Sequence, residues 1–240
     1  MLILALDTTS EAGGVALYKD DQCLAQIAHQ GAANEYSAAL FEMTDRLVAQ
    51  VAASQGSALK SLADANLFVI ANGPGSFTGI RVGIAAVQAW AKVFGKPVKG
   101  VSVLEALVET AQPVTENVLG ILNAYRGEFY VGEFRRAADG RFMASHEGRV
   151  ASAATLKELA SKLSGESANW TRLVRAHNKA ALALREDLGG DLRWQAVEDT
   201  LLDAMARLGS RAALEGHVDP PGQLDAYYLR RTDAELNWKE

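Results

Sequence analysis

The chain has 240 residues, of which 49% are hydrophobic and 22% are charged, a composition typical of a globular protein with a sizeable core. Its formal net charge of −5 argues against a protein that binds nucleic acid by itself, because contacts to the phosphate backbone are made mostly by Lys and Arg. The one cysteine, Cys23, excludes an internal disulfide and fits a reducing compartment.

The first residues carry no targeting signal that we recognise. Residues 1–6 are apolar but end at Asp7, and no basic segment precedes them, so we expect that they are not a signal peptide. No stretch is long and apolar enough to predict a membrane span. We therefore expect a cytoplasmic protein without a membrane partner.

Three strands are predicted at the start of the chain, at residues 2–6, 12–18 and about 22–29, separated by short polar turns. Consecutive strands followed by helix, strand and helix predict a mixed sheet covered by helices.

Residues 34–53 predict a helix whose apolar arc is wider than one core contact requires. Its main stripe consists of Tyr36, Leu40, Met43, Leu47 and Val51, while Phe41 and Val48 lie about a quarter turn away, beside Ser37, Thr44 and Ala52. Either the helix has a broad core face, which is the commoner case, or another protein covers part of it. In the second case Phe41 and Val48 would each contribute about 1.5–3 kcal/mol on burial.

A strand, a glycine loop and a second helix follow. The apolar run 67–71 predicts a buried strand that ends at the turn signal Asn72-Gly73-Pro74-Gly75. Ser76 or Thr78 can cap the helix, which extends to Phe94 before Gly95-Lys96-Pro97 ends it.

The glycine loop has two interpretations with about equal support. Free backbone N–H groups at a helix start favour phosphate, so that Gly73 and Gly75 could form an anion site. The segment is neither a P-loop nor a GxGxxG motif, however, and it could be a structural turn.

The second helix is apolar around most of its circumference. Arg81, Gln88 and Lys92 fall on one narrow stripe with Ala85. Gly79 and Gly83 leave one face without side chains, so something can approach that backbone closely. The helix is therefore either central to the core or covered by another protein.

The rest of the chain predicts a second lobe. Gln112-Pro113 breaks the pattern, 118–123 and 128–134 alternate like paired strands, residues 140–150 predict one further strand, and Ser152 opens a helix to 163. The expected organisation is a first lobe at 1–104, a smaller lobe at 105–197, a C-terminal helix at about 198–216, and an extended tail at 217–240.

Three segments, in this order, resemble the TsaB (YeaZ) family of bacterial tRNA-modification proteins: LALDTTS at 4–10, GPGSFTG at 73–79 and Tyr-Leu-Arg at 228–230. The resemblance is clear over residues 1 to about 104. It implies an α/β protein of the actin/sugar-kinase/Hsp70-like (ASKHA) class, with two lobes of mixed sheets flanked by helices and a reduced second lobe. The C-terminal helix would return to pack on the first lobe.

The same resemblance bears on nucleotide binding. In that superfamily the loop after the first strand faces phosphate and metal, which would give Asp7 and Thr9 a weak cofactor-binding role together with Gly73 and Gly75. A strand-ending Asp that only caps its turn is the favoured alternative.

The family also implies partners. In TsaB-like proteins two helices of the first lobe form both the self-dimer and the contact with the catalytic paralogue TsaD. Carried over, the partner-binding residues would be Tyr36, Leu40, Phe41, Thr44, Val48, Ser76, Phe77, Arg81, Ala85 and Gln88. A TsaE-like ATPase is a further expected partner. Contact with tRNA and any role of ATP are expected only at the level of the complex.

Catalytic chemistry is not indicated. The four histidines, at positions 29, 146, 177 and 217, lie in no metal-ligand spacing, and residues 103–110 lack the HxxxH pair that TsaD uses to hold a metal. We therefore expect no catalytic or metal-binding residues and no cofactor, but an accessory subunit that activates the transferase. The same omission weakens the idea that such proteins are metallopeptidases. The alternatives are an ATP-binding or ATP-hydrolysing enzyme that acts through Asp7, Thr9 and the glycine loop, and a self-dimer with no fixed partner.

Overall fold

The structure is a computed structural model that describes residues 1–29, 31–32, 35–54, 59–164, 169–175, 179, 182–183, 193–197 and 200–230. The chain divides into two compact units, Met1–Ala106 with Asp199–Ala226, and Leu107–Glu198 with Tyr227–Glu240. The first break falls between Ala106 and Leu107, inside α3 (Val103–Ala111).

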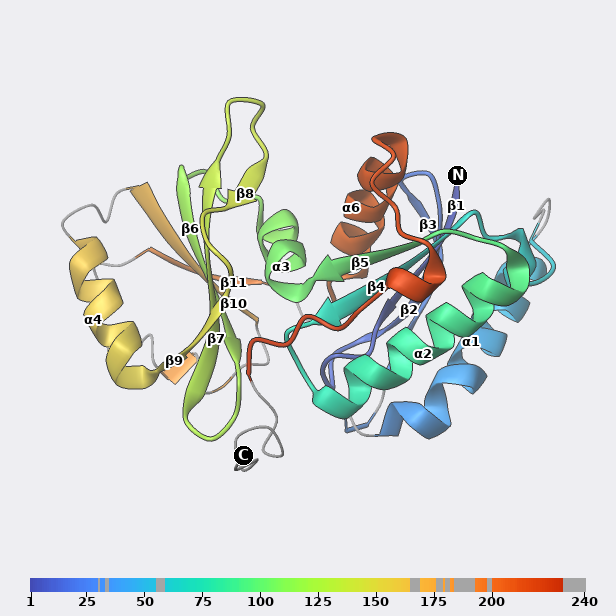
Figure 1. Ribbon diagram of the computed structural model, residues 1–240, viewed down its shortest axis with the longest axis horizontal. Coiled ribbons are helices and arrows are strands. Elements are labelled where there is room, and N and C mark those ends of the chain that lie inside the picture. The colour runs from blue at the N-terminus through green and yellow to red at the C-terminus, as the bar shows by residue number, and fades with distance from the viewer. Residues whose placement is uncertain are drawn as a thin grey trace. The chain divides into compact units, whose positions relative to one another are not determined.

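Unit 1 is built on a five-stranded mixed sheet in the order β3-β2-β1-β4-β5 (Figure 1). Its strands are β1 (Leu2–Asp7), β2 (Gly14–Lys19), β3 (Gln22–Ala28), β4 (Leu67–Gly73) and β5 (Val98–Ser102). The first three strands pair antiparallel, whereas β4 and β5 run parallel to β1. Almost every residue of β1, β2 and β4 is buried, because helices cover both faces of the sheet.

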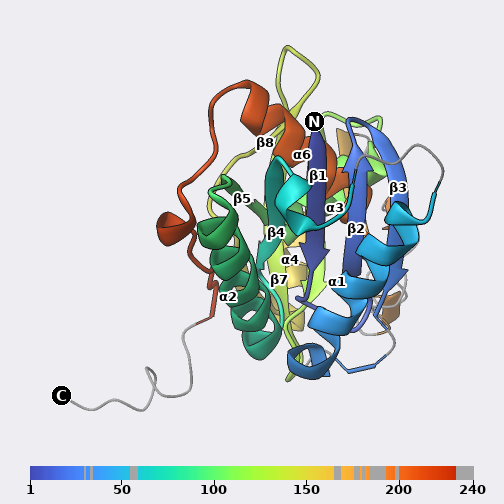
Figure 2. The same cartoon turned by 90° about the vertical axis from the view of Figure 1, so that its right-hand side faces the viewer.

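Two helices cover one face of this sheet, and a third covers the other (Figure 2). The pair α1 (Tyr36–Ala52) and α2 (Phe77–Phe94) lies side by side on one face, and α6 (Leu202–Leu214) packs on β1, β4 and β5. Neighbouring residues of β4 divide between the layers: Ile70 lies against α2 at Gly83, and Val69 lies against α6 at Gly209.

The start and end of α2 follow from the local sequence. Ser76 is the N-cap, and its hydroxyl accepts a hydrogen bond from the Gly79 N–H at 3.3 Å. Gly95 ends the helix in the left-handed region, with φ of 64°. Of the two candidate caps, the structure therefore selects Ser76.

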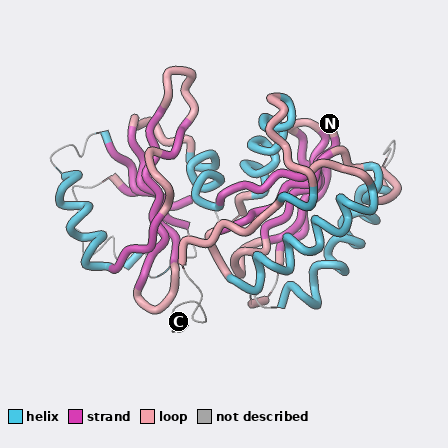
Figure 3. The backbone as a smooth tube through the Cα atoms, in the orientation of Figure 1, coloured by secondary structure: helices cyan, strands magenta, loops and turns pink. Residues whose placement is uncertain are grey.

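Unit 2 contains a second sheet, whose strands are drawn in magenta in Figure 3. It has six strands in the order β11-β10-β6-β7-β8, with β9 paired to β7. The strands are β6 (Asn117–Asn123), β7 (Glu128–Arg136), β8 (Phe142–Ala144), β9 (Arg149–Ser152), β10 (Trp170–Arg175) and β11 (Trp194–Val197). The helix α4 (Ala153–Ser164) covers one face. Ser152 accepts a hydrogen bond from the Thr155 N–H at 3.1 Å, which confirms it as the residue that opens this helix.

Three predictions about elements of the chain differ from the structure. Residues 140–150 form no single strand, because the chain turns after Ala144 and both β8 and β9 pair with β7. The last long helix begins at Leu202 and not at 198; residues 198–199 lie outside the described part of the chain. The tail is not simply extended either, since it contains the 3-10 turn η4 (Pro221–Gln223); residues 231–240 are not described.

Within the described segments, no helix combines the length and apolar character needed to cross a membrane. A further 3-10 turn, η2 (Leu62–Asp64), precedes β4.

Candidate partner-binding surface on α1 and α2

The predicted main stripe of α1 is core. Tyr36, Leu40 and Leu47 are fully buried against the sheet. Tyr36 stacks on His29 with ring centroids 4.0 Å apart and donates its hydroxyl to the Ser10 carbonyl oxygen at 3.1 Å.

This burial corrects part of the predicted binding set. Tyr36, Leu40 and Thr44 cannot contact a partner in this conformation, because at most 1% of each residue is exposed. The Thr44 hydroxyl donates to the Leu40 carbonyl oxygen at 2.7 Å, which satisfies it inside its own helix. Spacing alone could not separate these residues from Phe41, since all lie on one broad arc.

Phe41 lies at the junction of α1 and α2. It is 56% exposed, and its ring meets Trp90 of α2 edge to face, with centroids 5.8 Å apart. Val48, two turns further along α1, is half-buried. Phe41 therefore has a fixed position against its own chain but keeps more than half of its surface in water.

The outer face of α2 carries small and apolar side chains together with two exposed cations, Arg81 and Lys92. Phe77 is 38% exposed, and Arg81 and Ala85 are exposed one and two turns later. The Arg81 guanidinium lies 3.9 Å from the centroid of the Phe77 ring, a cation–π geometry that orients both side chains.

Ser76 and Gln88 are half-buried and make hydrogen bonds within their own chain. Ser76 caps α2, and the Gln88 amide donates to the Leu224 carbonyl oxygen at 2.8 Å. Their visible role is to hold the start of α2 and the segment after η4. Any contact of theirs with a partner stays a prediction.

Together these side chains define what we call the helix-pair surface: Phe41, Val48, Phe77, Arg81, Ala85, Ala89 and Trp90. Val48 and Trp90 are half-buried, and the other members of this set are exposed. Exposed aromatic and apolar side chains with an Arg among them are typical of a protein interface. Trp90 and Ala89 are absent from the set predicted by sequence. The sequence did not predict Trp90, because helical spacing within α2 does not show that this residue contacts Phe41 on the neighbouring helix.

The glycine loop packs on the segment that follows β1. Asp7 and Thr9 are buried, and one carboxylate oxygen of Asp7 accepts hydrogen bonds from the Thr9 N–H at 2.9 Å and the Thr9 hydroxyl at 2.6 Å. The Ser76 N–H donates to the Thr9 carbonyl oxygen at 2.7 Å. This geometry supports the interpretation of Asp7 as a residue that caps its turn.

The loop glycines allow this close packing. A Cβ on Gly75 would come within 2.6 Å of the Thr9 carbonyl oxygen, and Gly73 has φ of 127°. A structural reason for both glycines is therefore visible, whereas their cofactor-binding role stays a prediction.

The side-chain-free face of α2 has an occupant from the same chain. The Thr8 hydroxyl donates to the Gly79 carbonyl oxygen at 2.8 Å, and a Cβ on Gly83 would stand 2.3 Å from that hydroxyl oxygen. The close approach predicted from these glycines is thus made by Thr8, inside unit 1.

Metal ligands do not gather in the part of the chain that the structure describes: no group of three or more His, Cys, Asp or Glu side chains there could hold an ion. His177 is not among the described residues. The helix-pair surface itself carries one charged group and neither a nucleophile nor an acid–base pair, so its chemistry is that of packing.

The model of the TsaD family, tRNA N6-adenosine threonylcarbamoyltransferase, matches residues 29–177. A TsaB protein of tRNA threonylcarbamoyladenosine biosynthesis from Escherichia coli K12 is 31% identical over 248 residues, covering 100% of this chain and 98% of its own length. The Bacillus subtilis TsaB is 25% identical, with 100% and 99% covered.

Two solved structures from Pseudomonas aeruginosa share the fold. YeaZ superposes with a TM-score of 0.71 at 21% identity, covering 95% of this chain and 100% of its own. An uncharacterised protein described as similar to peptidase YeaZ gives 0.73 at 22% identity, with 95% and 99% covered.

The sheet topology and the flanking helices define an α/β protein with two mixed sheets, as predicted, and its fold is shared with the two Pseudomonas aeruginosa structures. Within that class the chain belongs to the TsaB/YeaZ family.

Proposed function

We propose that this chain acts in tRNA threonylcarbamoyladenosine biosynthesis as a non-catalytic subunit that binds and activates a TsaD-like transferase through the helix-pair surface. The names of its relatives support the pathway. The partner supplies the catalytic groups, and this chain supplies a packed surface that fixes the partner's active conformation.

The observation that carries the proposal is the position of Phe41. A large aromatic side chain, held by Trp90 and still 56% exposed, has the properties of an anchor that a partner buries. Arg81 and Phe77 extend the same surface along α2. An interface of the usual 1,200–2,000 Å² needs such a centre, because a few buried anchors provide most of the binding free energy.

The other members of the proposed assembly meet this chain only in the complex. A TsaE-like ATPase joins there, and tRNA and ATP act at that level, consistent with the net charge of −5 on this chain. No residue of this chain is assigned a step in the transfer of the threonylcarbamoyl group.

The first test replaces Phe41 by Asp and measures the affinity for the purified TsaD-like partner by calorimetry. Burial of a carboxylate in place of a phenyl ring should weaken binding at least 100-fold, with the thermal midpoint of the isolated chain nearly unchanged. Leu214→Asp is the matched control, because Leu214 is 84% exposed on α6, on the opposite face of the sheet. Equal affinity of both variants and the wild type would refute the assigned surface.

The accessory role is tested by the transfer reaction itself. Threonylcarbamoyl transfer to tRNA should require both this chain and the TsaD-like partner, and Phe41→Asp should abolish the stimulation. Transfer or ATP hydrolysis by this chain without the partner, lost on Asp7→Asn, would overturn the non-catalytic assignment.

A further inference from the structure

Unit 2 contains an arginine that is almost completely buried. Arg172 is the third residue of β10, and only 1% of it is exposed. Because the side chains of a strand alternate between its two faces, Arg172 shares a face with Trp170 and Val174. Both of these residues belong to an apolar cluster that also contains Leu156 of α4. Loss of hydration lowers the pKa of the Arg172 guanidinium, an effect that an adjacent anion would oppose.

One edge of this guanidinium has no partner among the residues that the structure describes. The Nη1 of Arg172 donates a long hydrogen bond of 3.5 Å to the Trp170 carbonyl oxygen. Nε and Nη2 are buried, and neither has an acceptor in the described part of the chain. These two nitrogens carry the parallel N–H groups with which an arginine binds two oxygens of one carboxylate or phosphate. The unpaired edge is therefore the one that suits an oxyanion.

Two indole N–H groups near Arg172 are unpaired as well. The Nε1 atoms of Trp170 and Trp194 are buried and have no acceptor within the described segments. Trp194 is the register partner of Arg172 on β11, and Trp170 precedes Arg172 by two residues on β10. The three residues thus contribute four buried nitrogens without a partner, and all four are donors. Since buried donors are nearly always paired, a group of donors alone indicates an acceptor that comes from outside.

We propose that Arg172, Trp170 and Trp194 form a binding site for a small oxyanion, a carboxylate or a phosphate group, held by the Nε–Nη2 edge of the guanidinium. The indole N–H groups supply further donors, and low exposure to water strengthens each charge-assisted hydrogen bond. A small anion suits the site better than a macromolecule, because the guanidinium itself is not exposed. β11 is the last strand of its sheet and Trp194 is half-buried, so the site lies one strand from the edge.

Nuclear magnetic resonance of the nitrogen-15-labelled chain tests the site directly. The indole N–H groups of Trp170 and Trp194 give separate signals, assigned with Trp→Phe variants, and a bound anion should shift both. The probes are sodium acetate and sodium phosphate, titrated against sodium chloride at constant ionic strength. We expect saturable shifts with at least one probe, and the tighter probe shows whether the site prefers a carboxylate or a phosphate. The signal of Trp90 on α2, in unit 1, should not move.

Two variants of Arg172 separate its charge from its geometry. Arg172→Met removes both, and should abolish the saturable shifts without lowering the thermal midpoint in chloride, because an unpaired buried charge is replaced by an apolar group. Arg172→Lys keeps the charge but loses the parallel N–H pair, and should bind the tighter probe at least 10-fold more weakly. Arg135→Met is the matched control, since Arg135 is exposed on β7 of the same sheet, and it should bind like the wild type.

Three results would overturn the proposal. Shifts that are absent, or that persist in Arg172→Met, would show that no oxyanion binds at Arg172. A thermal midpoint lowered by about 10 °C or more in Arg172→Met would show that the guanidinium is already paired within the chain, because breaking a buried ion pair is strongly destabilising. If Arg172→Met does not fold, Arg172→Lys decides, and binding as tight as in the wild type would exclude the guanidinium edge. None of these results bears on the transferase contact, which the isolated chain does not make.

Discussion

Gly75 and Gly83 have no room for a side chain, because each packs closely on a residue far earlier in the sequence. Gly75 packs on Thr9, and Gly83 packs on Thr8, the two residues that follow β1. At this scale the GPGSFTG segment serves to bring the start of α2 onto the end of a strand. A hydrogen bond from Ser76 to Thr9 completes the contact.

Gly75→Ala should therefore destabilise the protein by about 1–3 kcal/mol, because the new methyl group would stand 2.6 Å from both the carbonyl oxygen and the Cβ of Thr9. Gly222→Ala is the matched control, with no atom within 4 Å of its Cβ and an expected change within about 0.5 kcal/mol. Chemical denaturation of the three proteins measures the difference. A neutral Gly75→Ala would show that the loop can move away from Thr9.

At the scale of elements, α6 and the residue Thr200 just before it are attached to β2 and β3 by polar contacts across a wide sequence separation. The Tyr18 hydroxyl of β2 donates to the Asp203 carboxylate of α6, and Gln26 of β3 donates to the Thr200 hydroxyl at 3.2 Å. Gly209 lets the same helix approach Val69 of β4. These contacts explain why a C-terminal helix belongs to the N-terminal unit.

The Tyr18 contact predicts a dependence of stability on alkaline pH. Burial, and then the hydrogen bond and charge of Asp203, raise the pKa of the Tyr18 hydroxyl above its usual value. A raised folded-state pKa stabilises the fold below the unfolded-state pKa of about 10, and this contribution is lost as the pH rises above it. The free energy of unfolding should fall above about pH 10.

Tyr18→Phe should lower stability at pH 8 by about 1–3 kcal/mol, because the Asp203 carboxylate loses its donor, and should make the decline above pH 10 shallower. Denaturant titrations at pH 8, 10 and 11 measure both effects. Tyr125→Phe serves as the control, since Tyr125 is 57% exposed and should behave like the wild type. An unchanged alkaline decline in Tyr18→Phe would remove Tyr18 as its source.

For the whole molecule, one surface could serve two assemblies. The helix-pair surface is the expected site of both self-association and transferase binding, and burial of Phe41 in one complex excludes its burial in the other. The two assemblies should then compete.

We expect the isolated chain to elute as a dimer in size-exclusion chromatography with light scattering, and Phe41→Asp to elute as a monomer. Addition of the TsaD-like partner should convert the dimer to a heterodimer. Retention of the dimer within a larger complex would show that self-association and partner binding use different surfaces.

The sequence placed most elements well, because their signals are local. The alternating strands 118–123 and 128–134 pair with each other as expected, and Ser76 and Gly95 bound α2. The sequence did not predict β11, a four-residue strand that is defined by its parallel pairing with β10. It also misjudged residues 140–150, where pairing to β7 and not local propensity decides the two short strands.

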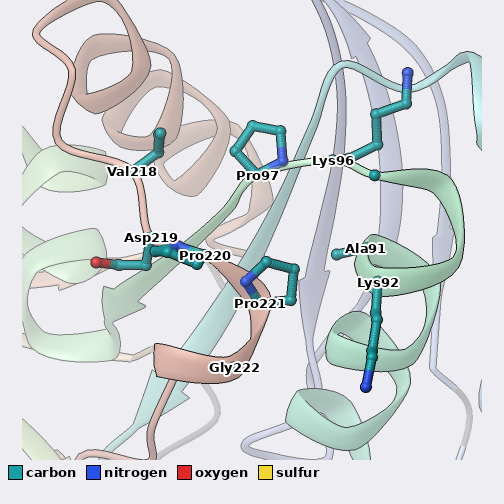
Figure 4. A pocket seen from close by; sticks show the side chains of 10 residues that line it. Ala91, Lys92, Lys96, Pro97, Val218, Asp219, Pro220, Pro221 and Gly222 are labelled. Atoms are coloured by element: carbon teal, nitrogen blue, oxygen red, sulfur yellow. The ribbon is translucent and has the colours of Figure 1, made fainter.

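The sequence by itself determined the family and the α/β class. Sequence motifs and the periodicity of hydrophobic residues are properties of consecutive residues, so they can be read without a structure. Only the tertiary structure decided which part of the broad apolar arc of α1 is exposed. Tyr36, Leu40 and Thr44 are buried, while Phe41 is exposed and contacts Trp90. It alone showed that Thr8 packs against the glycine face of α2 and that residues of η4 line a hollow beside the last turn of that helix (Figure 4). Burial depends on contacts between residues that lie far apart in the chain, and a local sequence pattern does not show which residues make these contacts.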